Sequence, residues 1–279
     1  MSTIPHSVEQ ALAEVAGGSF RLIAQSPGFL VEWEPEAERL CRGYGVPQAG
    51  TAIDDALFAQ PFGKAHVAVV RVRGDAASLR FRFLILSREL YSKFIADPFL
   101  VADRFAPHDA LRDLPTLEWP DEPPPPRTVE KLQQVLQTGG SPTLLGAVQA
   151  LIDGGRLVFD RPAPANQLMR DLWQLLPYSS QAELWPATFV FSGDLSFHVM
   201  ATPKAADLKL DRFLTEEQAL DYPHGRYELA LQYAIEHGDQ REIDRLFRRR
   251  SGRQTLRLAI FILIGAIVLA VVMGLLQPK

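Results

Sequence analysis

The sequence predicts an α+β fold with a two-part cytosolic body and a single C-terminal transmembrane helix. Three observations support this prediction. Short runs rich in Val, Ile and Phe alternate with stretches of helical periodicity along the first ~250 residues. A proline-rich segment at 113–128 divides these runs into two groups. The chain then ends in a long apolar run at 258–276.

The first part, residues 1–112, is expected to be an N-terminal α+β subdomain. In the run at 79–86, Arg80 and Arg82 alternate with phenylalanines, which is the period of a half-buried strand. Gly74–Ser78 has the composition of a hairpin loop before it. The expected strands of this part are Phe20–Ala24, His66–Val72 and Leu79–Leu86.

Helices are expected to close the first part. Ser87 is a suitable N-cap for a helix that runs to about Ala96. Asp97-Pro98 starts a short helical stretch at 99–105. In the segment 113–128, Pro120 and four consecutive prolines disfavour a helix and remove backbone donors, so we expect an extended linker. A proline-rich ligand for an aromatic groove is the alternative role.

The second part, residues 129–205, is expected to be another α+β subdomain, followed by a helical neck at 206–250. Prolines just inside helix starts and glycines just past helix ends delimit its helices. Expected helices are 128–137, 141–152 and 163–176, and expected strands are 156–159, 187–191 and 195–201. In the neck, stretches 216–237 and 240–250 are predicted to form a helix pair joined at Gly238-Asp239. Pro223 is expected to start the longer helix, with the part before it as a separate segment.

The final apolar run is long enough to cross a bilayer. Residues 258–276 are uncharged, and at 1.5 Å per residue a helix of this length reaches roughly 28 Å. A buried C-terminal core helix is the alternative, but such a helix usually keeps a polar face. We therefore predict a transmembrane helix.

Basic residues before the apolar run predict its orientation. Positive charge beside a span is retained on the cytoplasmic side, and one lysine, Lys279, follows the run. The N-terminus has no basic, apolar secretory signal. We therefore expect a tail-anchored, single-pass protein with its body in the cytoplasm, and the lipid bilayer as one partner. The flanking basic residues, which could also contact anionic headgroups, are Arg245, Arg248, Arg249, Arg250, Arg253 and Arg257.

Charge is distributed unevenly between the body and the anchor region. Residues 241–279 carry eight basic and two acidic residues, so the remaining 240 carry 21 basic and 31 acidic ones. An acidic body does not suit a nucleic-acid partner, which selects a basic surface. The single cysteine, Cys41, excludes an internal disulfide and is expected to be a buried apolar residue rather than a reactive thiol.

Several segments, taken in order, resemble the N-terminal region of bacterial GTPase-associated proteins. These segments are FRLIAQSPGF at 20–29, the paired strands at 66–86, ADPFLVADRF at 96–105, LLGAVQALIDGGRLVFD at 144–160, DLWQLLP at 171–177 and ATFVFS at 187–192. The resemblance covers roughly residues 5–205. It implies an adaptor domain that works with a GTPase, and hence a bacterial inner membrane for the anchor. It supplies no functional residue.

No catalytic, cofactor-binding or metal-binding residue is assigned from the sequence. P-loop, dinucleotide-binding, nucleophile-elbow and HExxH motifs are absent. Ser196 and His198 would share a strand face, as a nucleophile and base could. A turn followed by a half-exposed strand would have the same sequence pattern, and we expect that structural role. His224 is expected at a helix start, near Asp221 and Glu228, rather than as a metal ligand. Asp153, Asp160 and Asp171 fit turn chemistry better than a cation site.

Aromatic residues in the second part are candidates for either the core or an interface. These residues are Trp173, Trp185 and Phe189. With no catalytic signature, we expect a membrane-anchored, non-enzymatic adaptor that recruits a protein partner. The alternative is a membrane-attached hydrolase with an unrecognised active site.

Overall fold

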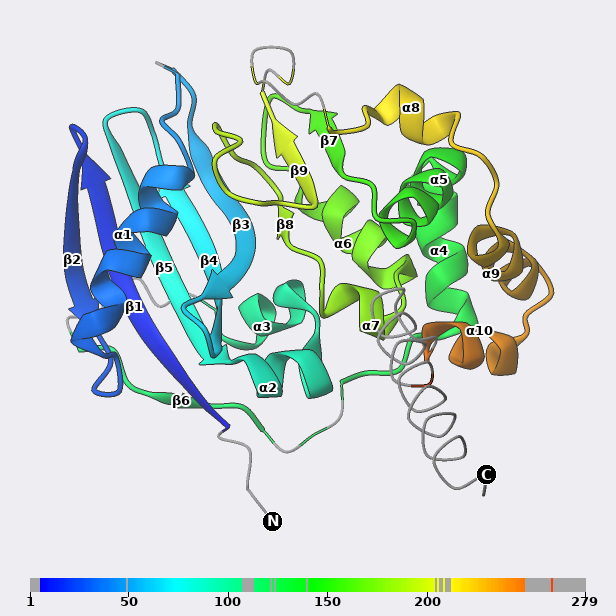
Figure 1. Ribbon diagram of the computed structural model, residues 1–279, viewed down its shortest axis with the longest axis horizontal. Coiled ribbons are helices and arrows are strands. Elements are labelled where there is room, and N and C mark those ends of the chain that lie inside the picture. The colour runs from blue at the N-terminus through cyan, green and yellow to red at the C-terminus, as the bar shows by residue number, and fades with distance from the viewer. Residues whose placement is uncertain are drawn as a thin grey trace, which may run out of the picture.

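The α+β class is confirmed by the computed structural model, which describes residues 6–48, 50–106, 113–120, 122, 124–138, 140–203, 205, 208, 212–248 and 262. A nine-stranded sheet runs through the described residues in the order β2-β1-β5-β4-β3-β8-β9-β7, with β6 also paired to β1. Figure 1 shows this sheet continuing from the long strands of the first part to the short strands of the second, beside which most of the helices gather.

Long antiparallel strands form the first part of the sheet. They are β1 (Ser7–Ala16), β2 (Ser19–Gln25), β3 (Ile53–Phe62), β4 (His66–Gly74) and β5 (Ser78–Ser87). The expected strands β2, β4 and β5 are confirmed, as is the β4–β5 hairpin. The sequence analysis did not assign β1 and β3. Strand β1 is rich in Ala, Glu and Gln, which do not favour strands, but it pairs with β2 on one side and β5 on the other.

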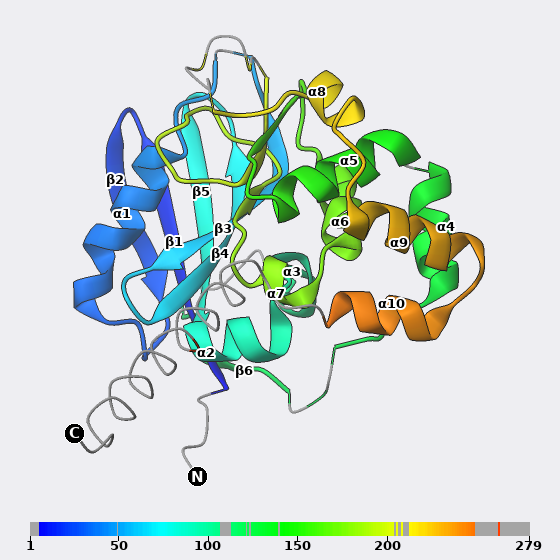
Figure 2. The ribbon, with the colours of Figure 1, turned by 45° about the vertical axis from the view of Figure 1, so that its right-hand side comes forward.

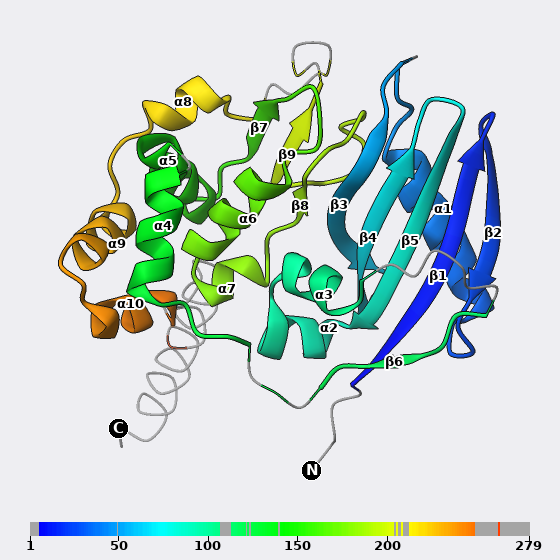
Figure 3. The same cartoon turned by 180° about the vertical axis from the view of Figure 1, so that it is seen from behind.

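Helices cover both faces of these strands. Helix α1 (Glu34–Gly43), preceded by the short turn η1 (Val31–Trp33), lies in front of the strands in Figure 1 and behind them in the reverse view of Figure 3. The opposite side carries α2 (Arg88–Leu90), the π-helical turn η2 (Tyr91–Ile95) and α3 (Pro98–Arg104). Ser87 Oγ accepts a bond from the Leu90 amide at 3.1 Å, which confirms the predicted cap.

The described residues of the segment 113–128 form no helix, as expected, but the segment is attached to the body. Strand β6 (Leu117–Glu118) pairs with β1, and the Trp119 amide donates to the His6 carbonyl at 2.7 Å. The Trp119 side chain is buried against Phe105, with ring centroids 5.9 Å apart. This segment therefore lies against the sheet over part of its length.

The second part adds short strands to the same sheet. Strand β8 (Pro186–Ala187) pairs with β3, while β9 (Val199–Thr202) lies parallel to both β8 and β7 (Leu157–Asp160). The expected strands at 187–191 and 195–201 are thus largely wrong in extent, because most of the chain between β8 and β9 forms no ladder. The sheet and its buried core are continuous across the expected boundary between the two parts.

Figure 2 shows most of the remaining helices grouped at the far end of the sheet. They are α4 (Val129–Thr138), α5 (Ser141–Ile152), α6 (Asn166–Leu175), α7 (Tyr178–Gln181), α8 (Glu216–Leu220), α9 (Arg226–Glu236) and α10 (Gln240–Phe247). The stretch at 216–237 forms two helices, α8 and α9, on either side of Pro223, as this proline led us to expect.

Within the described residues, no helix combines the length and apolar character needed to cross a bilayer. The span expected at 258–276 lies outside those residues, except for Ile262, and so do Arg249, Arg250, Arg253 and Arg257.

Candidate functional site

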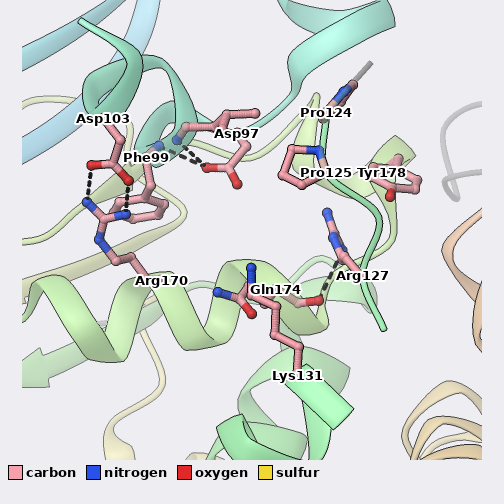
Figure 4. Close-up of a pocket in the computed structure, with 11 residues that line it drawn as sticks. Asp97, Phe99, Asp103, Pro124, Pro125, Arg127, Lys131, Arg170, Gln174 and Tyr178 are labelled. Carbon is pink, nitrogen blue, oxygen red and sulfur yellow. Dashed lines mark hydrogen bonds and ion pairs between the residues drawn. The ribbon is translucent and has the colours of Figure 1, made fainter. Parts of the chain in front are cut away.

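A small charged cavity lies where the two parts of the chain meet. Its volume is about 120 Å³. Helix α3, the end of the proline-rich segment and helices α4, α6 and α7 surround it (Figure 4). The lining residues are Asp97, Phe99, Leu100, Asp103, Pro124, Pro125, Arg127, Lys131, Arg170, Gln174 and Tyr178.

An unusual backbone conformation positions Asp97. The π-helical turn η2 ends at Ala96, a non-glycine residue in the left-handed region with φ of 50°. The Ala96 amide donates to the Tyr91 carbonyl at 2.7 Å, and Trp173 Nε1 donates to the Ala96 carbonyl at 3.0 Å. Left-handed alanine costs about 1–2 kcal/mol, and both π turns and such strained residues concentrate at functional sites.

One carboxylate oxygen of Asp97 caps helix α3. Its Oδ1 accepts from the Phe99 amide at 2.9 Å and the Leu100 amide at 3.2 Å. Among the described residues, no donor is bonded to Oδ2. Burial raises the pKa of this carboxyl, while its two amide bonds and the nearby Arg127 act in the opposite direction. A carboxylate oxygen is thus left at the cavity wall.

Arg127 holds three segments together on another side of the cavity. Its Nη1 donates to the carbonyls of Gln174 at 3.0 Å and Leu176 at 2.6 Å, and its Nη2 donates to Gln181 Oε1 at 2.5 Å. The guanidinium also stacks on the rings of Tyr178 at 4.4 Å and Phe247 at 4.7 Å. Because Phe247 belongs to α10, this arginine fastens the neck to the body.

The other charged groups differ in how fully they are paired. Arg170 and Asp103 form a bidentate ion pair at 2.6 and 2.7 Å, so they largely neutralise each other. Lys131 is exposed on the first turns of α4 and makes no ion pair with a described residue. Gln174 Oε1 is buried without a hydrogen-bond partner among the described residues. Figure 4 shows the Gln174 and Lys131 side chains on the opposite side of the cavity from Asp97.

This arrangement suits binding better than covalent catalysis. One wall presents a carboxylate, and the facing walls present a guanidinium and an ammonium group. No serine, cysteine or histidine lines the cavity among the described residues. The positioned charges and the apolar faces of Phe99 and Leu100 can orient a ligand, which is what small-molecule sites require.

The structure does not assemble the Ser196–His198 pair. Strand β9 begins at Val199, so neither residue lies on the strand face that was expected to align them. His198 Nδ1 accepts from the Trp185 amide at 3.1 Å, which commits this nitrogen to a structural contact. Ser192 Oγ accepts from the Asp194 amide at 3.0 Å, as a turn residue does.

The acidic residues considered for a cation site are engaged separately. Asp153 accepts from Gln149 Nε2 at 3.0 Å, Asp171 accepts from Gln167 at 2.7 Å, and Asp160 lines a different cavity. The described residues contain no group of three or more His, Cys, Asp or Glu that could hold a metal ion.

His224 lies just before helix α9, as expected for a residue at a helix start. It nevertheless contacts Glu228, with Nδ1 to Oε1 at 2.9 Å, because Gly225 caps the helix and turns the chain toward it. Cys41 is buried at 2% exposure in the core, and burial raises the pKa of its thiol.

The candidate interface aromatics lie in the core. Trp173 and Phe189 have no exposed surface, and Trp185 is 6% exposed, so none is presented to a partner. Of the flanking arginines, Arg245 pairs with Glu242 on α10 and Arg248 is the C-cap of that helix.

The chain matches no protein-family model, and no curated protein is similar enough to count as a relative. The cavity residues were also not found by sequence reasoning. Asp97 was noted as part of an Asp-Pro helix start, and Arg127 stands directly after the proline run, but neither pattern indicates that the two residues face one cavity.

Proposed function

We propose that this chain is a membrane-anchored, non-enzymatic adaptor whose body lies in the cytoplasm. The apolar run at 258–276 and the arginines before it support the anchor and its orientation. The acidic balance of the first 240 residues supports a protein partner rather than a nucleic acid.

The observation that carries this proposal is the docking of α10 on the body. Ile243 and Phe247 of this helix are buried, and Phe247 stacks on Arg127. The Gln240 side chain donates to the Arg127 carbonyl at 3.0 Å and accepts from the Val129 amide at 2.9 Å. A neck held this way transmits the position of the anchor to the body, as an adaptor that presents a partner at the membrane requires.

The partner we propose is a GTPase, and the membrane a bacterial inner membrane. The resemblance of six segments, taken in order, to the N-terminal region of GTPase-associated proteins supports this choice. A membrane-attached hydrolase has less support, because His198 Nδ1 is occupied by a backbone amide and Ser196 does not share a strand with it.

Two experiments test the proposal. Full-length protein should remain with membranes after a high-salt wash, whereas residues 1–250 should move to the soluble fraction. Affinity purification of both forms, followed by mass spectrometry, should recover one near-stoichiometric protein, a GTPase, with each. Full-length protein in the soluble fraction would refute the anchor, and recovery of no stoichiometric protein with either form would refute the adaptor role.

A further inference from the structure

We propose that the cavity beside Asp97 binds a small zwitterion, a free α-amino acid or a compound with the same charge pattern. Its ammonium group would face Asp97 Oδ2, and its acidic group would face Arg127 and Lys131. This inference concerns the body alone and does not depend on the membrane anchor or on the identity of a protein partner.

The first argument is electrostatic. Asp97 and Arg127 carry opposite charges, yet they form no ion pair within 4.0 Å, and the cavity lies between them. A charge that is taken out of water without an ion-pair partner is costly, because hydrogen bonds to neutral groups compensate it only in part. A ligand with a positive group at one end and a negative group at the other would compensate both charges at once.

The second argument is the set of hydrogen-bonding atoms left over. Asp97 Oδ1 is used by two amides, which leaves Oδ2 as an acceptor. A carboxylate oxygen without a bonded donor calls for a group with several N–H donors, and an ammonium group is such a donor.

The third argument is that donors lie opposite this acceptor, across the cavity from Asp97 (Figure 4). Lys131 has three ammonium hydrogens and no ion-pair partner among the described residues. Three of the five N–H groups of Arg127 are bonded to the Gln174 and Leu176 carbonyls and to Gln181, which leaves two N–H groups for a further acceptor. A carboxylate between Arg127 and Lys131 would use these donors.

The fourth argument is size. Pockets for drug-sized ligands usually enclose about 300–1,000 Å³, and this cavity encloses about 120 Å³. Nucleotides and folded peptides are therefore too large. The walls made by Phe99, Leu100 and Pro125 leave room for a short apolar side chain at most.

The test is calorimetric titration of the full-length protein in detergent micelles with glycine, L-serine and L-glutamate. Acetate and methylamine, which each carry half of the charge pattern, are the ligand controls. We expect saturable binding of at least one amino acid and much weaker binding of both half-ligands. Absence of saturable binding by the folded protein, or acetate binding as tightly as the amino acids, would overturn the zwitterion site.

Two variants locate the binding. Asp97→Asn keeps an acceptor for the helix cap, and Lys131→Gln changes an exposed side chain, so both should fold as judged by circular dichroism. Each should weaken binding about tenfold or more. The matched control is Lys93→Gln, which removes a surface lysine paired with Glu89 and should leave binding unchanged. Binding that survives both site variants would place the ligand elsewhere and overturn the inference.

Discussion

Replacing Arg127 with alanine tests whether one side chain fastens the neck to the body. The guanidinium donates to the Gln174 and Leu176 carbonyls and to the Gln181 side chain, and it stacks between Tyr178 and Phe247. Arg127→Ala removes all of these contacts and leaves their acceptors at the edge of an enlarged cavity.

The expected cost follows from these contacts. A hydrogen bond from a charged donor contributes roughly 1.5–3 kcal/mol, and each ring contact about 0.5–1 kcal/mol. Two effects offset part of this loss. The half-buried charge no longer has to be desolvated on folding, which saves several kcal/mol, and water can reach the freed carbonyls. The net loss in unfolding free energy should be about 3–4 kcal/mol, because three neutral acceptors lose a buried donor, at about 1–3 kcal/mol each where water does not replace it.

Urea unfolding of the full-length protein in a mild detergent, followed by tryptophan fluorescence, measures this loss. Arg226→Ala is the matched control, because Arg226 is exposed at the start of α9, and its change should stay within about 0.5 kcal/mol. The loss in unfolding free energy for Arg127→Lys should fall between those of the two alanine variants, because lysine keeps the positive charge but not the planar guanidinium with its several N–H donors.

Hydrogen exchange adds a local measurement. The amides of α10 should lose protection in Arg127→Ala, because Phe247 loses the guanidinium on which it stacks. A cost for Arg127→Ala below about 1 kcal/mol, or α10 amides that remain fully protected, would refute the argument that this arginine fastens the neck.

Three further predictions concern other parts of the body. Gly146→Ala should destabilise the protein by about 2–3 kcal/mol in urea unfolding, because an added Cβ would lie 2.0 Å from the Ala219 carbonyl oxygen. Helix propensity alone predicts that alanine stabilises the helix by about 1 kcal/mol. A stabilised variant would therefore contradict the close packing of Gly146 against Ala219. Burial raises the pKa of Asp97 above 3.8, so the folded protein binds its proton more tightly, and this contribution to stability is lost as pH rises through the raised value. Between pH 3.8 and the raised pKa, the stability of Asp97→Asn relative to wild type should therefore increase with pH and then level off, and a pH-independent difference would contradict this. Cys41, at 2% exposure and with its thiol pKa raised by burial, should react with thiol reagents only as fast as the protein opens; rapid labelling of the folded protein would show that it is not buried.

Local sequence signals predicted several elements correctly because their cause is local. Alternating Arg and Phe in β5 reflects a strand with one buried face, and Ser87 caps the helix that follows it, as expected. The same reasoning did not identify β1, whose residues favour helix. Pairing with β2 and β5 overrides that preference, and such pairing partners are distant in sequence.

The candidate site could not be predicted for the same reason. Asp97, Arg127 and Gln174 come from three separate segments, and each has an ordinary local explanation as a cap, a residue after prolines or a helix residue. Trp173, a candidate for an interface, is instead in the core, where its indole N–H holds the Ala96 carbonyl beside Asp97.

By itself, the amino-acid sequence determined the α+β class, the strands β2, β4, β5 and β7, and most helix positions. It also determined the separation of an acidic body from a basic, apolar C-terminal region, because periodicity, capping and charge are properties of neighbouring residues. Only the tertiary structure decided that a single sheet joins both parts, that α10 docks through Phe247 on Arg127, and that opposite charges face each other across a cavity. These features depend on which distant segments bury one another, and that choice is made by packing and desolvation over the whole chain.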